Sequence, residues 1–266
     1  MPELPEVETV RRGLAERLAG RTITAAWRGD APLRKPSPLS LDGLVGRRVM
    51  GIRRHAKVMF WDLDDASVLV AHLGMTGKFL FDAAPAHTHL RLSLDDGSTL
   101  TYSDPRRFGW LAWHAPDDAP TDAAHYGMDA LDPAFDAAAL AGLLAGSRAP
   151  LKAFLLDQTK VAGLGNIYAC EALWRAGLSP RRLARNTPRA KVPVLRDAMV
   201  AVLQDSLAAG GTSFNDYVDS IGQKGSFLFD GAVFQREGLP CPRCTTPVRR
   251  IVQSGRSTFY CPGCQR

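Results

Sequence analysis

Four cysteines near the end of the chain constrain its fold more than any other feature. They follow the spacing C-x2-C-x16-C-x2-C, at Cys241, Cys244, Cys261 and Cys264. Two residues between cysteines let both thiolates of a pair reach one tetrahedral ion, and four thiolates close its coordination sphere. The spacing predicts a single structural Zn²⁺ on a β-hairpin ribbon; two disulfides, the alternative, are disfavoured in a reducing compartment. The fifth cysteine, Cys170, lies among apolar residues, and we expect it in the core.

Length and composition bound the class of protein. The chain has 266 residues, of which 45% are apolar. This length accommodates two compact domains of roughly 130 residues each. No apolar run approaches the roughly 18 residues of a membrane span. The N-terminal sequence MPELPEVETVRRG lacks the apolar core of a signal peptide. We therefore expect a cytoplasmic protein with no membrane partner.

Basic residues are concentrated in the second half of the chain. Residues 147–266 hold 17 Lys and Arg against 8 Asp and Glu, whereas residues 1–146 hold 16 against 19. A basic half of this size indicates a polyanionic partner, most simply nucleic acid. The alternative is a solvated basic surface without a partner.

Hydrophobic periodicity separates a strand-rich first half from a helical second half. It predicts a helix over Pro5–Leu18, followed by short strands between residues 22 and 113 with turn signals between them. Strands at this spacing favour a sandwich or a barrel, so the chain is α+β. Later helices are expected at 135–144, 151–156, 166–174 (capped by Asn166) and 194–209.

Lys57 is the basic residue of most interest in the strand region. It lies in the segment RRHAKVMFW, residues 53–61. Alternation along one strand would place Arg53, His55 and Lys57 on the same face. We therefore expect this basic face to line a cleft or to meet solvent.

Five segments resemble the formamidopyrimidine-DNA glycosylase family, in the family's own order. They are PELPEVETVRRG at 2–13, HLGMTG at 72–77, SDPRRFG at 103–109, GLGNIYACEALW at 163–174 and the zinc ribbon. Because these segments extend from residue 2 to residue 264, the resemblance covers the whole chain.

The resemblance implies a division of the chain into four parts. Residues 1–114 would form an N-terminal catalytic β-sandwich domain that carries the N-terminal helix, and residues 115–147 a connection. Residues 148–236 would form a helix–two-turns–helix DNA-binding domain, and residues 237–266 the zinc finger. Residues 219–230 align with a loop that folds over the extruded base.

The resemblance also implies an activity. It is that of a bifunctional DNA glycosylase/AP lyase of base excision repair, which removes 8-oxoguanine opposite cytosine and formamidopyrimidines. The enzyme would then cleave the strand by β,δ-elimination. We expect a monomer acting at the nucleoid on double-stranded DNA that contains oxidised purines or abasic sites, with Zn²⁺ as its only cofactor.

Two alternatives stay open at this point. One is an endonuclease VIII-like glycosylase for oxidised pyrimidines, although the sequence DPRRFG and Leu4 favour the first interpretation. The other is a non-catalytic zinc-ribbon DNA-binding protein. Such a binder would not require removal of Met1, so an intact-mass measurement separates it from an enzyme.

Four residues receive chemical roles from the resemblance. Pro2, freed by removal of Met1, is the nucleophile that forms a Schiff base at C1′ of the damaged nucleotide. An α-amine has a reference pKa of about 7.7–8.0, so its nucleophilic form is accessible near neutral pH. Glu3 acts beside it as general acid/base. Lys57 contacts a phosphate and assists β-elimination, and Arg256 clamps the flanking phosphates and is linked to δ-elimination.

The resemblance implies that seven further residues contact DNA. Three of them would fill the space left by the extruded base and contact its partner, because an emptied stack is unfavourable. Those three are Met75, Arg106 and Phe108. The other four DNA-binding residues implied by the resemblance are His87, Arg148, Lys152 and Asn166.

Overall fold

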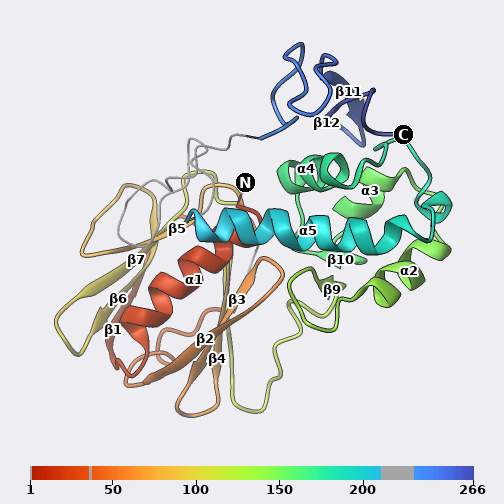
Figure 1. Cartoon of the computed structure of the whole chain (residues 1–266). Helices are drawn as coiled ribbons and strands as arrows, with labels where there is room; N and C mark the ends of the chain where they lie inside the picture. The colour runs from red at the N-terminus through yellow and green to blue at the C-terminus, as the bar shows by residue number, and fades with distance from the viewer. Residues whose placement is uncertain (1, 36–37, 211–230) are drawn as a thin grey trace. The chain divides into compact units, whose positions relative to one another are not determined.

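A computed structural model of the chain describes residues 2–35, 38–210 and 231–266 (Figure 1). The chain divides into two compact units, one of residues 1–124 with 209–228 and one of residues 125–208 with 229–266. The predicted loop at 219–230 lies outside the described residues. Among the described helices, none combines the length and the apolar character needed to cross a membrane.

The first unit begins with helix α1 (Leu4–Leu18). Glu3 is its N-cap, and the Glu6 carboxylate accepts a hydrogen bond from the Glu3 amide at 2.8 Å, which is part of a capping box. Pro5 lies in the first turn, where a missing N–H breaks no helical hydrogen bond. The predicted apolar stripe is buried in the sandwich core through the side chains of Val7, Val10, Leu14 and Leu18.

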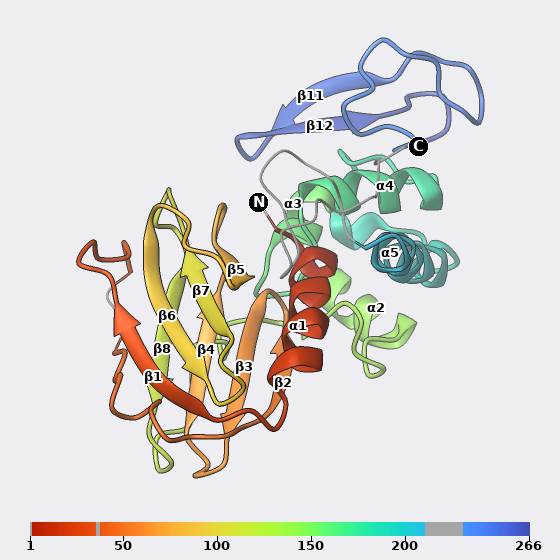
Figure 2. The ribbon, with the colours of Figure 1, turned by 90° about the vertical axis from the view of Figure 1, so that its left-hand side faces the viewer.

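Two antiparallel four-stranded sheets form the sandwich that the resemblance implied (Figure 2). The first has the order β1-β6-β7-β5, with bounds β1 (Ile23–Arg28), β5 (Lys78–Phe81), β6 (Thr88–Leu94) and β7 (Thr99–Ser103). The second has the order β2-β3-β4-β8, with bounds β2 (Val49–His55), β3 (Val58–Leu63), β4 (Val68–His72) and β8 (Trp110–His114).

Aromatic side chains join the two sheets in the core. The ring of Trp61 on β3 lies 5.3 Å from that of Phe79 on β5, and Phe79 lies 4.9 Å from Tyr102 on β7. All three side chains are almost fully buried. Tilted ring pairs at these distances are favourable beyond the area that they bury. The core therefore holds the sheets face to face and fixes the loops at their ends.

The second unit is helical. Its elements are β9 (Met128–Asp129), α2 (Ala137–Ala145), α3 (Leu151–Leu156), β10 (Val161–Ala162), α4 (Asn166–Ala176), the 3-10 turn η1 (Ala184–Asn186) and α5 (Lys191–Ala208). Gly177 ends α4 in the left-handed conformation with φ 69°, which glycine adopts readily. Helix α5 begins three residues earlier than expected, since Pro193 is tolerated in a first turn.

The zinc ribbon closes the second unit. Strands β11 (Arg249–Gln253) and β12 (Arg256–Tyr260) form an antiparallel hairpin whose two-residue turn is Ser254-Gly255. Both turn residues have positive φ, 49° and 71°, which matches the twist of the strands. The ribbon shares a small core with α4 that includes Cys170, so the prediction that this cysteine is buried is confirmed.

Candidate active site and zinc centre

Pro2 directly precedes the capped start of α1. Its side chain is partly exposed, whereas Glu3 and Glu6 are 3% and 2% exposed. The first-turn amides of a helix carry partial positive charge, which disfavours protonation of a nearby amine. A secondary amine freed at Pro2 would lie at the positive end of α1, whose field favours its neutral, nucleophilic form.

Lys57 is not on a strand, so the predicted basic face is wrong. Residues 56 and 57 form the two-residue turn between β2 and β3, and Ala56 has φ 54°. The turn interrupts the alternation that would have aligned Arg53 and His55 with Lys57. The Lys57 side chain is 6% exposed. It therefore lies against the protein instead of extending from a solvated strand.

An ion cluster around the buried Glu8 carboxylate joins α1 to the turn that contains Lys57. The Glu8 carboxylate accepts hydrogen bonds from Arg11 and Arg12 at 2.9 Å and from Arg54 at 3.1 Å. The same Arg54 donates to the carbonyl of Ala56 at 2.7 Å. The Arg54 guanidinium therefore fixes Ala56, the residue before Lys57, relative to α1.

Glu8 did not stand out in the sequence, although its spacing to Arg11 and Arg12 is that of helical ion pairs. Burial raises the pKa of Glu8, but hydrogen bonds from Arg11 and Arg12 and the charges of Arg11 and Arg54 lower it more, so the pKa lies below its ordinary value. The cluster is therefore ionised and intact at neutral pH.

The three predicted void-filling residues lie on two adjoining loops. We call residues 73–77 the Met75 turn and residues 104–109 the Arg106 loop. The Thr76 hydroxyl accepts a hydrogen bond from the Arg106 amide at 3.2 Å. Phe108 is 38% exposed, and the guanidinium of Arg34 lies 4.1 Å from its ring centroid. The structure thus brings together segments that are 30 residues apart.

His87 is joined to the Arg106 loop through its backbone. It is exposed and has φ 61°, and its carbonyl accepts from the Asp104 amide at 3.1 Å. Asp104, which entered the sequence analysis only as part of the segment SDPRRFG, has no exposed surface. Sequence reasoning missed this residue as an organiser of the site, because two of its partners, Thr76 and His87, lie on other segments of the chain.

Lys152 and Asn166, expected to contact DNA, both hold the zinc hairpin. The Lys152 ammonium donates to the Ser257 carbonyl at 3.1 Å and to the Thr258 hydroxyl at 2.6 Å. Asn166 Nδ2 donates to the same carbonyl at 3.0 Å. Lys152 has no exposed surface. Its contact with DNA stays a prediction, whereas its contact with the hairpin is direct.

Asn166 is also not the helix cap that the sequence suggested. Gly165 occupies the N-cap position of α4, and Asn166 is the first helical residue. A residue at that position can direct its side chain away from the helix, which here allows the bond to the hairpin. Asn166 thus contributes to hairpin placement instead of helix initiation.

Gln253 and Glu171 complete the attachment of the ribbon, and neither was singled out from the sequence. Gln253 Nε2 donates to the Pro180 carbonyl at 3.2 Å. The buried Glu171 carboxylate on α4 accepts from the three successive amides of residues 232–234 at 2.8 to 3.0 Å. These contacts hold the hairpin and the segment that leads into it.

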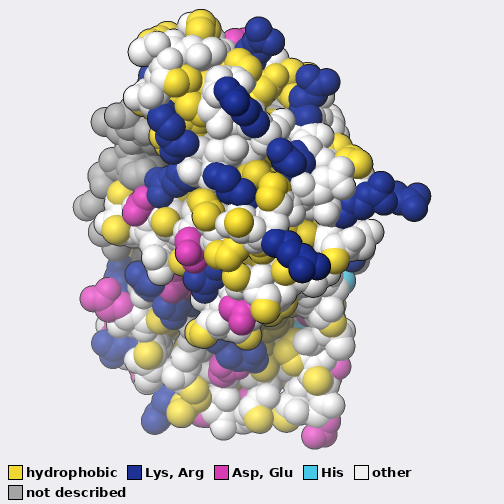
Figure 3. All heavy atoms as spheres, turned by 45° about the vertical axis from the view of Figure 1, so that its right-hand side comes forward, with side chains coloured by type: hydrophobic (Ala, Val, Ile, Leu, Met, Phe, Trp, Pro, Cys, Tyr) yellow, Lys and Arg dark blue, Asp and Glu magenta, His cyan; other side chains and the backbone are white. Residues whose placement is uncertain are grey.

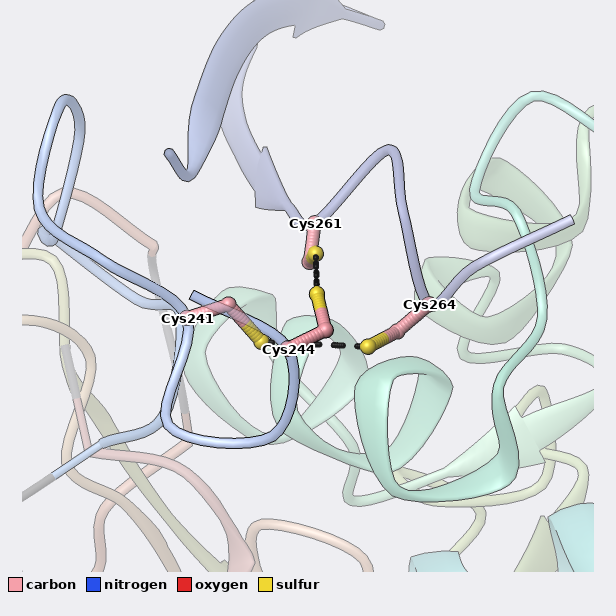
Figure 4. Close-up of side chains that lie close together, drawn as sticks. All are labelled: Cys241, Cys244, Cys261 and Cys264. Atoms are coloured by element: carbon pink, nitrogen blue, oxygen red, sulfur yellow. Dashed lines mark hydrogen bonds between the residues drawn. The ribbon is translucent and has the colours of Figure 1, made fainter. Parts of the chain in front are cut away.

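The four ribbon cysteines form a site of the right size for zinc (Figure 4). Their sulfur atoms lie within 4.8 Å of one another, with 3.4 Å between Cys244 and Cys261 and 3.9 Å between Cys241 and Cys264. Zn–S bonds of about 2.3 Å place the sulfurs of a tetrahedral site about 3.8 Å apart. The predicted structural zinc site is therefore confirmed.

The environment of the thiols differs across the site. Hydrogen bonding to Thr246 lowers the pKa of Cys244 to about 6, whereas burial and the neighbouring thiols raise the pKa of Cys264 to about 12. Such divergence arises because a thiolate opposes ionisation of the next thiol. A divalent cation between the sulfurs removes this opposition, so the donor set suits Zn²⁺.

The second unit carries an exposed basic surface. In Figure 3, Lys and Arg side chains outnumber Asp and Glu over the upper part of the visible face. Exposed arginines of this unit include Arg148, Arg181, Arg185, Arg189, Arg243, Arg249, Arg250 and Arg256. Arg256 is the first residue of β12, directly after the hairpin turn. The surface therefore suits a phosphate backbone.

Comparison with known proteins identifies the family. A model of the formamidopyrimidine-DNA glycosylase N-terminal domain matches residues 1–111, and one of that family's H2TH domain matches residues 126–218. A model of the zinc finger found in FPG and IleRS matches residues 238–266. The chain is 46% identical to the formamidopyrimidine-DNA glycosylase of Paracoccus denitrificans, with 100% of both chains covered. The chain belongs to the formamidopyrimidine-DNA glycosylase family.

Solved structures of formamidopyrimidine-DNA glycosylases agree with this fold. The crystal structure of the MutM (Fpg) protein from Thermus thermophilus has a TM-score of 0.87 and 41% identity, with 99% of this chain and 98% of that chain covered. A MutM in complex with DNA containing carbocyclic 8-oxo-G has a TM-score of 0.88 and 32% identity, with 100% of both chains covered. The α+β fold expected from the sequence is therefore confirmed.

Proposed function

We propose that this protein is a bifunctional DNA glycosylase/AP lyase that removes oxidised purines from duplex DNA. Family membership over the whole chain carries the proposal. The related MutM bound to DNA containing an 8-oxo-G analogue supports 8-oxoguanine and formamidopyrimidines as the bases removed. The relatives matched here are formamidopyrimidine-DNA glycosylases, which favours this function over an endonuclease VIII-like enzyme or a non-catalytic binder.

In this proposal the Pro2 amine begins the reaction. Its nitrogen attacks C1′ of the damaged nucleotide, and the bond from C1′ to the base breaks, so the base leaves with the bonding electrons and a proton. Opening of the sugar ring then gives an iminium between Pro2 and C1′. The buried Glu3 carboxylate, one residue along, is suited to transfer the protons.

Lys57 and Arg256 would act on the phosphates during strand cleavage. Loss of a C2′ proton from the iminium expels the 3′ phosphate, and a second elimination expels the 5′ phosphate. A lysine held in a turn can place one positive charge at a phosphate, whereas arginine offers a fork of donors to two oxygens. The hairpin contacts from Lys152 and Asn166 support a fixed position for Arg256.

Base extrusion requires residues that replace the lost stacking. We assign this role to Met75, Arg106 and Phe108, because they lie on adjoining loops and Phe108 is exposed. Phe108 can wedge between bases, and Arg106 can donate hydrogen bonds to the partner cytosine. His87 and Arg148, both exposed, are suited to backbone phosphates.

Borohydride trapping tests the proposed nucleophile. The protein reacts with a duplex that contains 8-oxoguanine opposite cytosine in the presence of borohydride, and the adduct is digested and mapped. We expect one protein–DNA bond, at the N-terminal peptide that begins with Pro2. A matched duplex with undamaged guanine is the control. An adduct on a lysine, or base release without any trapped adduct, would contradict the proposal.

We also propose that the protein works at the nucleoid, since its substrate is chromosomal duplex DNA. Fluorescence microscopy of a tagged protein, compared with a DNA stain, tests this location. A diffuse signal that excludes the stained DNA would contradict it.

A further inference from the structure

Thr76 connects two loops that the proposed function uses for different tasks. It follows Met75 directly, and its hydroxyl donates to Asp104 Oδ1 while accepting from the Arg106 amide at 3.2 Å. A single hydroxyl therefore links the Met75 turn to the backbone of Arg106. Both ends of this link lie within the first unit.

Asp104 makes the link part of a wider network. Its Oδ2 accepts from the Gly109 amide at 2.7 Å, and its Oδ1 accepts from the Arg106 amide at 3.3 Å. The backbone amide of Asp104 also donates to the His87 carbonyl. Because Asp104 is 0% exposed, water does not compete for these bonds. The Arg106 loop is thus organised around one buried carboxylate.

The backbones of the two loops are in close contact. A methyl group on Gly74 would lie 2.4 Å from the Gly109 amide nitrogen and 2.5 Å from the Phe108 carbonyl carbon. A methyl group on Gly109 would lie 2.7 Å from the His72 carbonyl oxygen. Glycine is required at both positions because no side-chain carbon fits. A shift of either loop toward the other is therefore opposed by direct backbone contact.

We propose that Thr76 is a specificity-determining residue that couples the insertion of Met75 to the reading of the partner base by Arg106. The inference rests on the proposed function, in which Met75 fills the void and Arg106 contacts the base opposite the lesion. Thr76 touches neither base and acts as a positioning residue through the backbone of Arg106. When Met75 enters the duplex, the Thr76 hydroxyl fixes the backbone position from which the Arg106 side chain extends.

The coupling predicts a particular kinetic defect. Without the Thr76 hydroxyl, Arg106 would be less well aligned with a partner cytosine, while attack by Pro2 on C1′ would be preserved. Loss of one hydrogen-bonding group corresponds to about a three- to tenfold change. The kcat/KM ratio for 8-oxoguanine opposite cytosine over that opposite adenine should therefore fall by this factor.

Thr76→Val and Thr76→Ser provide the matched test. Valine keeps the shape and removes the hydroxyl, whereas serine keeps the hydroxyl and should restore the ratio. Thr24→Val, at an exposed threonine on β1, is the control for the same chemical change elsewhere. Excision from the two duplexes is measured for each variant, and thermal unfolding verifies the fold. If Thr76→Val does not fold, Thr76→Ala removes the same hydroxyl and is judged by the same ratio.

The outcomes separate this inference from the function on which it rests. An unchanged ratio in Thr76→Val would overturn the inference, and so would an equal loss on both duplexes, which is the mark of a merely structural role. A Thr76→Ser variant as defective as Thr76→Val would also overturn it. A wild-type protein that releases no base from either duplex would instead contradict the proposed function, and the inference with it.

Discussion

The ammonium group of Lys152 donates to the carbonyl of Ser257, 105 residues away in the sequence. The lysine lies on α3 and the serine on β12, next to Arg256. A cation buried in this way fixes the hairpin. The contact explains how α3 can hold Arg256, at the start of β12, in place.

Replacing Lys152 separates anchoring from DNA contact. Lys152→Met removes the donor to Ser257 and Thr258 and should lower the free energy of unfolding by about 1–3 kcal/mol, because buried acceptors lose their partner. The δ-elimination product should also decrease, since Arg256 is less well placed. The salt dependence of DNA affinity should stay unchanged, whereas a lost phosphate contact would reduce its slope by about 0.9. Calorimetry, product analysis and binding titrations measure these effects.

Lys160→Met is the matched control, since Lys160 is exposed and lies in the same part of the chain. It should leave stability and product ratio unchanged. A Lys152→Met variant with wild-type stability but a reduced salt slope would show that the lysine contacts phosphate and does not anchor the hairpin.

Two substitutions in the zinc ribbon test its structural role and its contact with DNA separately. Cys244→Ser should lose zinc, because a neutral hydroxyl is a poor replacement for a thiolate, and the hairpin should unfold locally. Arg256→Ala should keep zinc and the fold, and should lose a charge-assisted phosphate contact of about 1.5–3 kcal/mol. Metal analysis and duplex affinity, measured in parallel, distinguish them. Stoichiometric zinc in Cys244→Ser, or normal binding and cleavage by Arg256→Ala, would contradict these assignments.

Local patterns predicted the elements that depend on local structure. Helix α1 follows from hydrophobic periodicity, and the zinc ribbon follows from cysteine spacing alone. The turn at Ala56 was missed because its positive φ is carried by alanine, without the glycine or asparagine that marks such turns.

Contacts between distant segments could not be predicted in the same way. The hydrogen bond from Arg106 to Thr76 and that from Lys152 to Ser257 depend on how strands and helices pack, and neither leaves a periodic signal. The resemblance to the family identified Arg106 and Lys152 as site residues. It did not indicate that Lys152 is buried or that Asp104 organises the loop that holds Arg106.

The Glu8 cluster makes the stability of the first unit depend on pH. Because the pKa of Glu8 is lower in the folded protein than its ordinary value of 4.5, the folded state favours the carboxylate. The stabilisation is complete above the ordinary value and is lost as pH falls through the lower, folded value. Glu8→Gln should therefore lower Tm at neutral pH, with a difference from wild type that shrinks below pH 4.5. Glu16→Gln, at an exposed position on the same helix, should show no such difference.

Salt dependence measures how many phosphates the basic surface neutralises. Each neutralised phosphate contributes about −0.9 to the slope of log affinity against log salt, so duplex affinity should fall steeply with salt. Arg148→Ala and Arg256→Ala should each reduce the steepness by about 0.9 if each contacts one phosphate. Arg28→Ala, at an exposed arginine on β1, is the control and should leave the slope unchanged. Titrations of an undamaged duplex at several salt concentrations give the slopes. A wild-type slope near zero would show that phosphate contacts are not the main source of affinity, and equal effects of all three variants would indicate general charge instead of specific contacts.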